Sequence, residues 1–89
     1  MTHIVKRAGH KQKFDERKLY ASVFAACLSS HVKKEEAEAI ANLVAREVKE
    51  WMGKKKEVDS NEIFEKATEE LTHLNKDASF MYKTHRDIS

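Results

Sequence analysis

Residues 6–18, KRAGHKQKFDERK, decide how this chain begins to fold. A short β-branched run precedes them. Because glycine supplies the left-handed backbone of a tight turn, Ala8-Gly9 predicts a hairpin over about residues 3–14. A helix pattern then begins at Asp15. The segment holds six cationic and two anionic side chains, a local charge of +4, whereas the rest of the chain holds 11 and 13, a net charge of −2. The excess positive charge therefore lies on a hairpin and the start of a helix, as in a phosphate-binding site.

The composition predicts one small globular domain covering residues 1–89. With 40% apolar and 36% charged residues the chain is not a disordered type, and no apolar run is long enough to cross a membrane. The absence of a signal-peptide pattern and the single cysteine, Cys27, predict a cytoplasmic protein in a reducing compartment. Cys27 occupies a core-type helical position, which predicts a plain buried thiol. A net charge of +2 is too small for a protein whose main task is to wrap nucleic acid.

Helical periodicity predicts an all-helical remainder after the hairpin. Asp15 is the expected N-cap of the first helix, and Asp59 with Glu62 forms the capping box of the third. A hairpin alone is unstable in water, so it is expected to pack against the helices, which gives an α+β fold class with a β-hairpin on four helices. The four helices are expected at about residues 15–30, 33–52, 59–74 and 76–86.

The motifs of an enzyme are missing from the sequence. The five histidines have no metal-ligand spacing, and one cysteine cannot build a structural zinc site. No Gly-x-Ser-x-Gly elbow and no Walker loop is present. The sequence therefore predicts that the chain is not an enzyme.

Three cations, Lys6, Arg7 and Lys18, are placed by the hairpin and the following helix toward one point. A triphosphate would relieve their mutual repulsion. The alternative is that lysines on short strands merely keep a sheet edge soluble, and composition alone leaves the two interpretations equal. Nucleic acid is a third candidate, but no aromatic residue interleaves with the basic ones to stack on bases.

Two parts of the sequence together resemble the ATP-cone domain, and the resemblance covers essentially the whole chain. The residues that carry it are Val5-Lys6-Arg7-Ala8-Gly9, Phe14-Asp15, Lys18-Leu19 and Val58-Asp59-Ser60-Asn61-Glu62-Ile63. The resemblance implies an N-terminal hairpin packed on an orthogonal four-helix bundle. It also implies a regulatory domain that binds ATP or dATP, here free-standing. Such domains begin many ribonucleotide reductase large subunits and the repressor of reductase genes, and occur in some archaeal phosphoglycerate kinases.

The resemblance also implies roles for individual residues. Phosphates would be held by cations, the base by the start of the third helix, and the sugar would lie near Asp15. The phosphate residues are Lys6, Arg7 and Lys18, with Arg86 as a further basic contact. The other residues implied to contact the nucleotide are Val5, through its main chain, Ser60, Ile63 and Phe64. A role for Phe64 in the hydrophobic core is at least as well supported. Whether Mg²⁺ accompanies the nucleotide is left open.

Several positions depart from the family pattern, and they leave the choice between ATP and dATP open. Ala8 replaces the usual Asp or Asn, Lys13 stands where proline is common, and the last helix lacks Tyr-x-x-Tyr-Arg. A sensor without an attached effector would signal by self-association or through a separate protein, such as a reductase subunit or repressor. Trp51 and Met52 are candidates for that surface. The alternative functions are a nucleic-acid-associated regulator and an interaction module that has lost its nucleotide.

Overall fold

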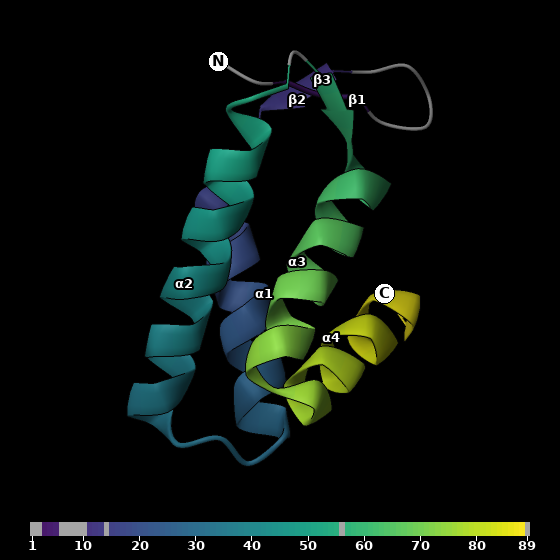
Figure 1. Ribbon diagram of the computed structural model, residues 1–89. Helices are drawn as coiled ribbons and strands as arrows, with labels where there is room; N and C mark the ends of the chain where they lie inside the picture. The colour runs from purple at the N-terminus through teal and green to yellow at the C-terminus, as the bar shows by residue number, and fades with distance from the viewer. Residues whose placement is uncertain (1–2, 6–10, 14, 56, 89) are drawn as a thin grey trace.

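The computed structural model describes the backbone of residues 3–5, 11–13, 15–55 and 57–88, and the side chains of residues 15–55 and 57–84. Four helices form the body of the described chain, and three short strands lie at one end of it (Figure 1). In chain order the elements are β1 (His3–Val5), β2 (Lys11–Lys13), α1 (Glu16–Ser29), α2 (Lys34–Met52), β3 (Glu57–Asp59), α3 (Ser60–Leu74) and α4 (Lys76–Ile88).

The strands form one sheet in the order β2-β1-β3. β1 pairs antiparallel with β2 and parallel with β3, so it is the central strand. Val5 lies opposite Lys11 on one side and opposite Asp59 on the other. The end of β1 is thereby fixed beside the residue that precedes α3.

The predicted fold class, α+β with a hairpin packed on an orthogonal bundle, is wrong. The described part of the chain is mainly helical, with helices of 13 to 19 residues and strands of three. β1 and β2 do not stand as a separate hairpin, because β3 joins them. Val58 is buried between exposed Glu57 and Asp59, which is the alternation of a strand, but three residues are too few to reveal a strand in sequence.

Aspartates begin two of the helices. The Oδ1 atom of Asp15 accepts hydrogen bonds from the backbone N–H groups of Arg17 (3.0 Å) and Lys18 (3.3 Å). Asp59 Oδ1 accepts one from the backbone N–H of Glu62 at 2.8 Å. Each such cap stabilises a helix by about 1 kcal/mol because it satisfies amides that have no partner inside the helix. The N-caps expected from the sequence are confirmed.

The helices pack in a ring, in which α1 and α3 each contact both α2 and α4. α1 and α3 therefore lie diagonally across the bundle. Apolar residues at helical spacing on all four helices fill the space between them, together with Val58 of β3. Among the described residues, no helix combines the length and apolar character needed to cross a membrane.

The turn between α1 and α2 closes the end of the bundle opposite the sheet. His31 adopts a left-handed backbone, with φ of 66°. The N–H of Val32 donates to the Cys27 carbonyl at 3.0 Å, and the N–H of His31 donates to the Leu28 carbonyl at 3.1 Å. These bonds satisfy carbonyls at the end of α1, as in a Schellman-type cap.

Candidate functional site

The N-terminal ends of α1 and α3 both lie at the sheet, because each helix directly follows a strand (Figure 1). The aligned peptide dipoles of a helix place partial positive charge at its N-terminus. Two diagonal helices thus direct their positive ends toward the same end of the bundle. Of the cation-rich segment 6–18, the residues that the structure describes, 11–13 and 15–18, lie at this end in β2 and at the start of α1.

The cap carboxylates change what this end can bind. Asp15 Oδ1 already accepts from two amides of α1, and Asp59 Oδ1 accepts from one amide of α3. A phosphate at either tip would meet these carboxylates and fewer unpaired amides than a bare helix end offers. Cationic side chains, more than the helix ends themselves, are therefore needed to hold an anion here.

The structure brings several of the predicted site residues to the start of α3. The main chain of Val5 pairs beside Asp59, and Ser60, the first residue of α3, is exposed next to it. Ile63 lies one turn later but is only 8% exposed and belongs to the core. Only a small part of Ile63 is accessible to a ligand.

Phe64 turns toward α4. Its ring stacks on Tyr82, with centroids 5.2 Å apart and planes 18° from parallel. Phe64 also lines a hollow of about 420 Å³ between the two helices, and the other residues that line it are Asn61, Glu65, Thr68, Glu69 and Lys83. Sequence reasoning did not associate Tyr82 or Lys83 with Phe64, because contacts between separate helices leave no local signal.

On α1, Lys18 is exposed in the first turn and Asp15 caps it. Lys6 and Arg7 lie outside the described residues, although Val5 and Lys11 on either side of them pair with each other. The side chain of Arg86 is also outside the described ones. Its helix, α4, runs part of the way back from the far end of the bundle toward the sheet (Figure 1).

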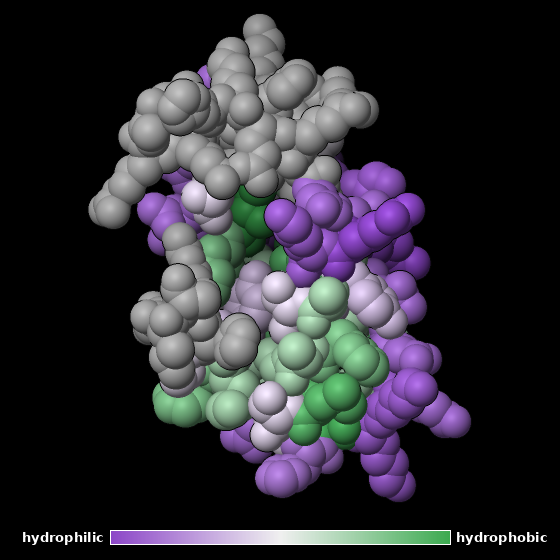
Figure 2. Space-filling model, turned by 180° about the vertical axis from the view of Figure 1, so that it is seen from behind, coloured by the Kyte–Doolittle hydropathy of each residue, from purple (hydrophilic) through white to green (hydrophobic). Residues whose placement is uncertain are grey.

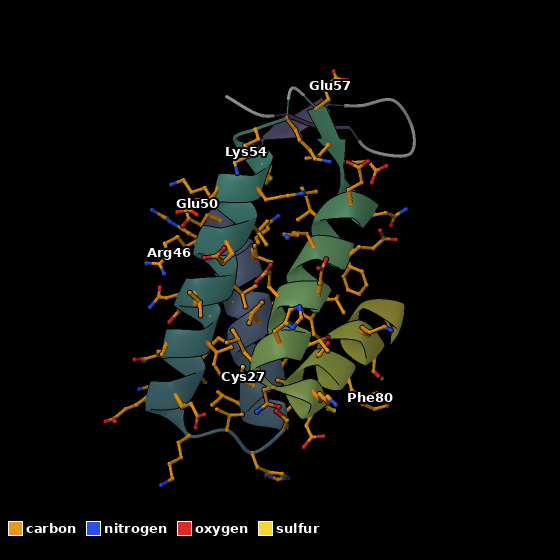
Figure 3. The ribbon with its side chains drawn as sticks, viewed as in Figure 1. Cys27, Arg46, Glu50, Lys54, Glu57 and Phe80 are labelled. Carbon is orange, nitrogen blue, oxygen red and sulfur yellow. The ribbon has the colours of Figure 1, made fainter. Side chains whose placement is uncertain are left out.

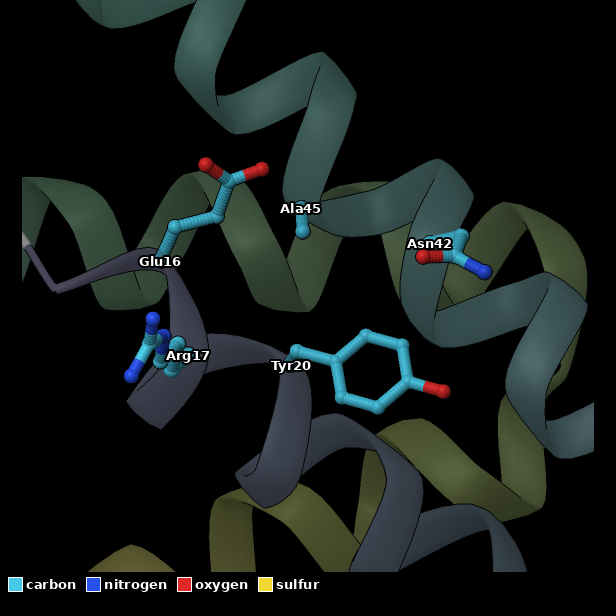
Figure 4. Close-up of a pocket in the computed structure, with 5 residues that line it drawn as sticks. All are labelled: Glu16, Arg17, Tyr20, Asn42 and Ala45. Atoms are coloured by element: carbon cyan, nitrogen blue, oxygen red, sulfur yellow. The ribbon is translucent and has the colours of Figure 1, made fainter.

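A second hollow, of about 260 Å³, lies between α1 and α2 (Figure 4). Glu16, Arg17, Tyr20, Asn42 and Ala45 line it, and none of these was a predicted site residue. Glu16 forms an ion pair with Lys49 across its rim at 3.3 Å. The mixed charges and exposed ion pair give this hollow no preference for an anion.

Cys27 behaves as the buried thiol that its position predicts. Its side chain is fully buried between the helices (Figure 3). Burial raises its pKa above the ordinary value, and Glu36 raises it further. The thiol therefore stays protonated at neutral pH and is a poor nucleophile. Among the described residues, no group of three or more His, Cys, Asp and Glu side chains is arranged to hold a metal ion.

Comparison with known proteins identifies the family of this chain. The family model described as the ATP cone domain matches residues 2–87. A curated relative, the transcriptional repressor NrdR of Sorangium cellulosum (strain So ce56), is 32% identical over 89 residues, which cover 96% of this chain and 57% of the relative. The chain thus spans little more than half the length of that repressor. No solved structure matches significantly. Since the family match extends over nearly all of the sequence, the chain belongs to the ATP-cone domain family.

Proposed function

We propose that this domain binds ATP or dATP at the sheet end of the bundle and acts as a regulatory module without turnover of its own. The observation that carries the proposal is the meeting of two helix N-termini at the sheet, next to the described part of the cation-rich segment, residues 11–13 and 15–18. Membership of the ATP-cone family supports it, because the family implies a nucleotide-sensing regulatory role. The domain would act in the cytoplasm through self-association or a separate effector protein.

The phosphates are assigned to Lys6, Arg7 and Lys18, with Arg86 as an additional basic contact. Lys18 is exposed at the tip of α1, and the other two directly follow Val5, whose main chain lies beside Asp59. Each hydrogen bond to a charged phosphate contributes roughly 1.5–3 kcal/mol. Several such contacts outweigh the repulsion between the phosphates and the two cap carboxylates.

The base is assigned to the first turns of α3. Ser60 offers a hydroxyl, Ile63 offers the small accessible part of an apolar side chain, and Phe64 offers a ring already supported by Tyr82. The main chain of Val5 would border this pocket. Asp15 is placed near the sugar, because a carboxylate that caps α1 through Oδ1 has a second oxygen to accept from a ribose hydroxyl.

Magnesium, where present, would be held mainly by the phosphates. Mg²⁺ keeps most of its waters and commonly binds through substrate phosphates with one or two carboxylates. The two cap residues, Asp15 and Asp59, lie at this end of the bundle and offer such carboxylates.

Calorimetric titration with ATP, dATP, GTP and AMP tests the proposal. We expect ATP and dATP to bind, and GTP and AMP to bind more weakly. The double variant Lys6→Ala/Arg7→Ala should lose binding and keep its melting temperature. The matched double variant Lys33→Ala/Lys34→Ala, which changes exposed lysines at the other end of the bundle, should bind as the unchanged chain does. Equal binding of all four nucleotides, or of none, would refute the proposal.

A nucleic-acid-associated regulator remains the second candidate, since the curated relative is a transcriptional repressor. The small net charge of +2 argues against direct binding. Salt dependence separates the two functions. DNA binding that is lost over a modest salt increase, with indifference to nucleotides, would favour the second candidate.

A further inference from the structure

The charges of the chain are divided between segments of opposite sign. Residues 57–74, which form β3 and α3, hold six acidic side chains and one basic side chain, a local charge of −5. The rest of the chain holds 9 acidic and 16 basic side chains, a charge of +7. Lys66, the one lysine of the acidic segment, is already paired with Glu70 at 3.1 Å. The outer surface of α3 is therefore strongly negative, although the whole chain is weakly basic.

The exposed glutamates of α3 border the hollow between α3 and α4. Glu62, Glu65 and Glu69 follow one another at intervals of three and four residues, which places them along one side of the helix. Glu65 and Glu69 line the hollow of about 420 Å³, together with half-buried Phe64 and, from α4, Lys83. Among the described side chains, no ion pair joins Lys83 to either glutamate. The hollow thus combines an aromatic ring with an excess of negative charge.

Aromatic rings lie on both helices that form this hollow. On α3, the Phe64 ring is held in place by its stack on Tyr82. On α4, Phe80 is 67% exposed and lies on the outer side of the helix (Figure 3). It precedes Lys83 by one helical turn, so the two side chains are on the same side of α4. A cation can bind over the face of such a ring, and arginine does so more often than lysine.

The opposite side of the bundle offers a partner little charge. Figure 2, which looks at the molecule from behind, shows apolar and weakly polar side chains over much of its lower part and charged side chains along one edge. Leu74, at 42% exposed, ends α3 and does not line the hollow. The exposed positions of α1 within residues 19–30 are uncharged, and they are Ala21, Ser22, Ala25, Leu28 and Ser29. None of these positions carries a charge that would select a partner, whereas the hollow does.

The surface suggested by the sequence for a partner, Trp51 with Met52, does not serve this role. Met52 is 3% exposed, and half-buried Trp51 packs against the core with the Lys55 ammonium 4.5 Å from its ring centroid. Both side chains are used within the fold.

From the charge and the aromatic rings we propose that the hollow between α3 and α4 binds an arginine-rich segment of a separate protein. One guanidinium enters the hollow, contacts the Phe64 ring and donates hydrogen bonds to Glu65 or Glu69. A planar guanidinium matches a carboxylate in a bidentate pair, whereas an ammonium acts as a point charge. A second arginine of the segment lies over the exposed ring of Phe80. Lys83 repels the segment, but two carboxylates attract it.

The binding is expected to be weak and sensitive to salt. An exposed ion pair contributes little and is screened by ions, so several arginines on one segment must act together. Nucleic acid, which is a polyanion, is repelled by this surface. The inference rests on the proposed function only in that it gives the chemistry of the separate effector protein named there. The surface itself is present without nucleotide.

Fluorescence anisotropy of a labelled hexa-arginine peptide, measured without nucleotide at about 20 mM salt, tests the surface. The double variant Glu65→Gln/Glu69→Gln should weaken binding about 5- to 30-fold, the equivalent of two exposed charge pairs. The matched double variant Glu38→Gln/Glu50→Gln removes the same charge from exposed positions of α2 and should bind as the unchanged chain does. Circular dichroism should show both variants folded.

Two further measurements test the charge and the shape of the occupant. Lys83→Gln removes the cation from the wall of the hollow, so it should strengthen binding of the peptide about 2- to 5-fold. An anionic occupant would instead bind this variant more weakly. A hexalysine peptide carries the same charge as hexa-arginine but cannot pair in bidentate geometry, and it should bind several-fold more weakly.

The proposal would be overturned by equal effects of the two glutamine double variants, by weaker peptide binding in Lys83→Gln, or by equal affinities of the two peptides. Absence of hexa-arginine binding at about 1 mM chain would overturn it as well. Lys6→Ala/Arg7→Ala should keep the peptide affinity. A chain that binds the peptide in this way but binds no nucleotide would refute the proposed function and leave this surface standing.

Discussion

The two ends of the helical bundle are built on different principles. At the end opposite the sheet, polar groups form hydrogen bonds with one another. The Ser30 hydroxyl bonds to carbonyls of α1, the Asn75 Oδ1 atom accepts from the backbone N–H of Ala78, and the hydroxyls of Thr72 and Ser79 lie 2.6 Å apart between α3 and α4. At the sheet end, two helices begin at carboxylate caps and the cationic segment enters. The far end is closed by internal hydrogen bonds, whereas the charges of the sheet end suit an external anion.

The largest difference between the two ends should appear when one lysine is removed from each. Lys18→Ala should weaken ATP binding about 10- to 150-fold, the equivalent of one charged hydrogen bond of roughly 1.5–3 kcal/mol. Lys34→Ala, at the far end, should leave the affinity unchanged. Both lysines are exposed, so stability should change by less than about 0.5 kcal/mol in either variant. Calorimetry and thermal melts measure the two quantities. If the Lys18 and Lys34 variants bind ATP with equal affinity, Lys18 does not contact the nucleotide.

A smaller effect is expected from the cap of α3. Asp59→Ala removes the acceptor for the Glu62 amide and should cost about 1 kcal/mol, which lowers the melting temperature by about 4–8 °C in a domain of this size. Asp59→Asn retains an oxygen acceptor and should restore most of the stability. If the asparagine variant has the same melting temperature as the alanine variant, the negative charge of the carboxylate, and not its hydrogen bond to the Glu62 amide, is the stabilising feature.

The smallest effect is expected at the far end, in the α1–α2 turn. His31 has a left-handed backbone, which disfavours side chains with a Cβ atom. His31→Gly should raise the free energy of unfolding by less than about 1 kcal/mol, because glycine also gains entropy in the unfolded chain. His73→Gly, in the last turn of helix α3, should instead lower it by up to about 1 kcal/mol, the penalty of glycine in a helix interior. Denaturant titration measures both. A His31→Gly variant that is clearly destabilised would show that the His31 side chain stabilises the turn.

What the sequence predicted well depends on local signals. The helix bounds lie within one or two residues of those expected, because Asp15, Asp59 and the apolar spacing act within a single helix. The sheet was mispredicted because β3 is three residues long and pairs with β1 from the other end of the sequence. Neither its length nor its distant partner leaves a periodic pattern.

The candidate site also contains residues whose positions follow from local signals and residues whose positions depend on tertiary packing. The positions of Lys18 and Ser60 at helix starts follow from capping. The stack of Phe64 on Tyr82 and the low exposure of Ile63 follow from how α3 packs, which sequence spacing does not specify. The exposure of Ala21, Ala25 and Leu28 became clear only once the neighbouring helices were placed.

The assignment of nucleotide binding to the sheet end is tested most directly by an NMR titration of the ¹⁵N-labelled chain with ATP. The amide signals of Val5, Lys18, Ser60 and Ile63 should shift together as the site fills, while those of residues 30–34 at the far end stay in place. Shifts concentrated at residues 30–34, or no shifts at millimolar ATP, would contradict the assignment.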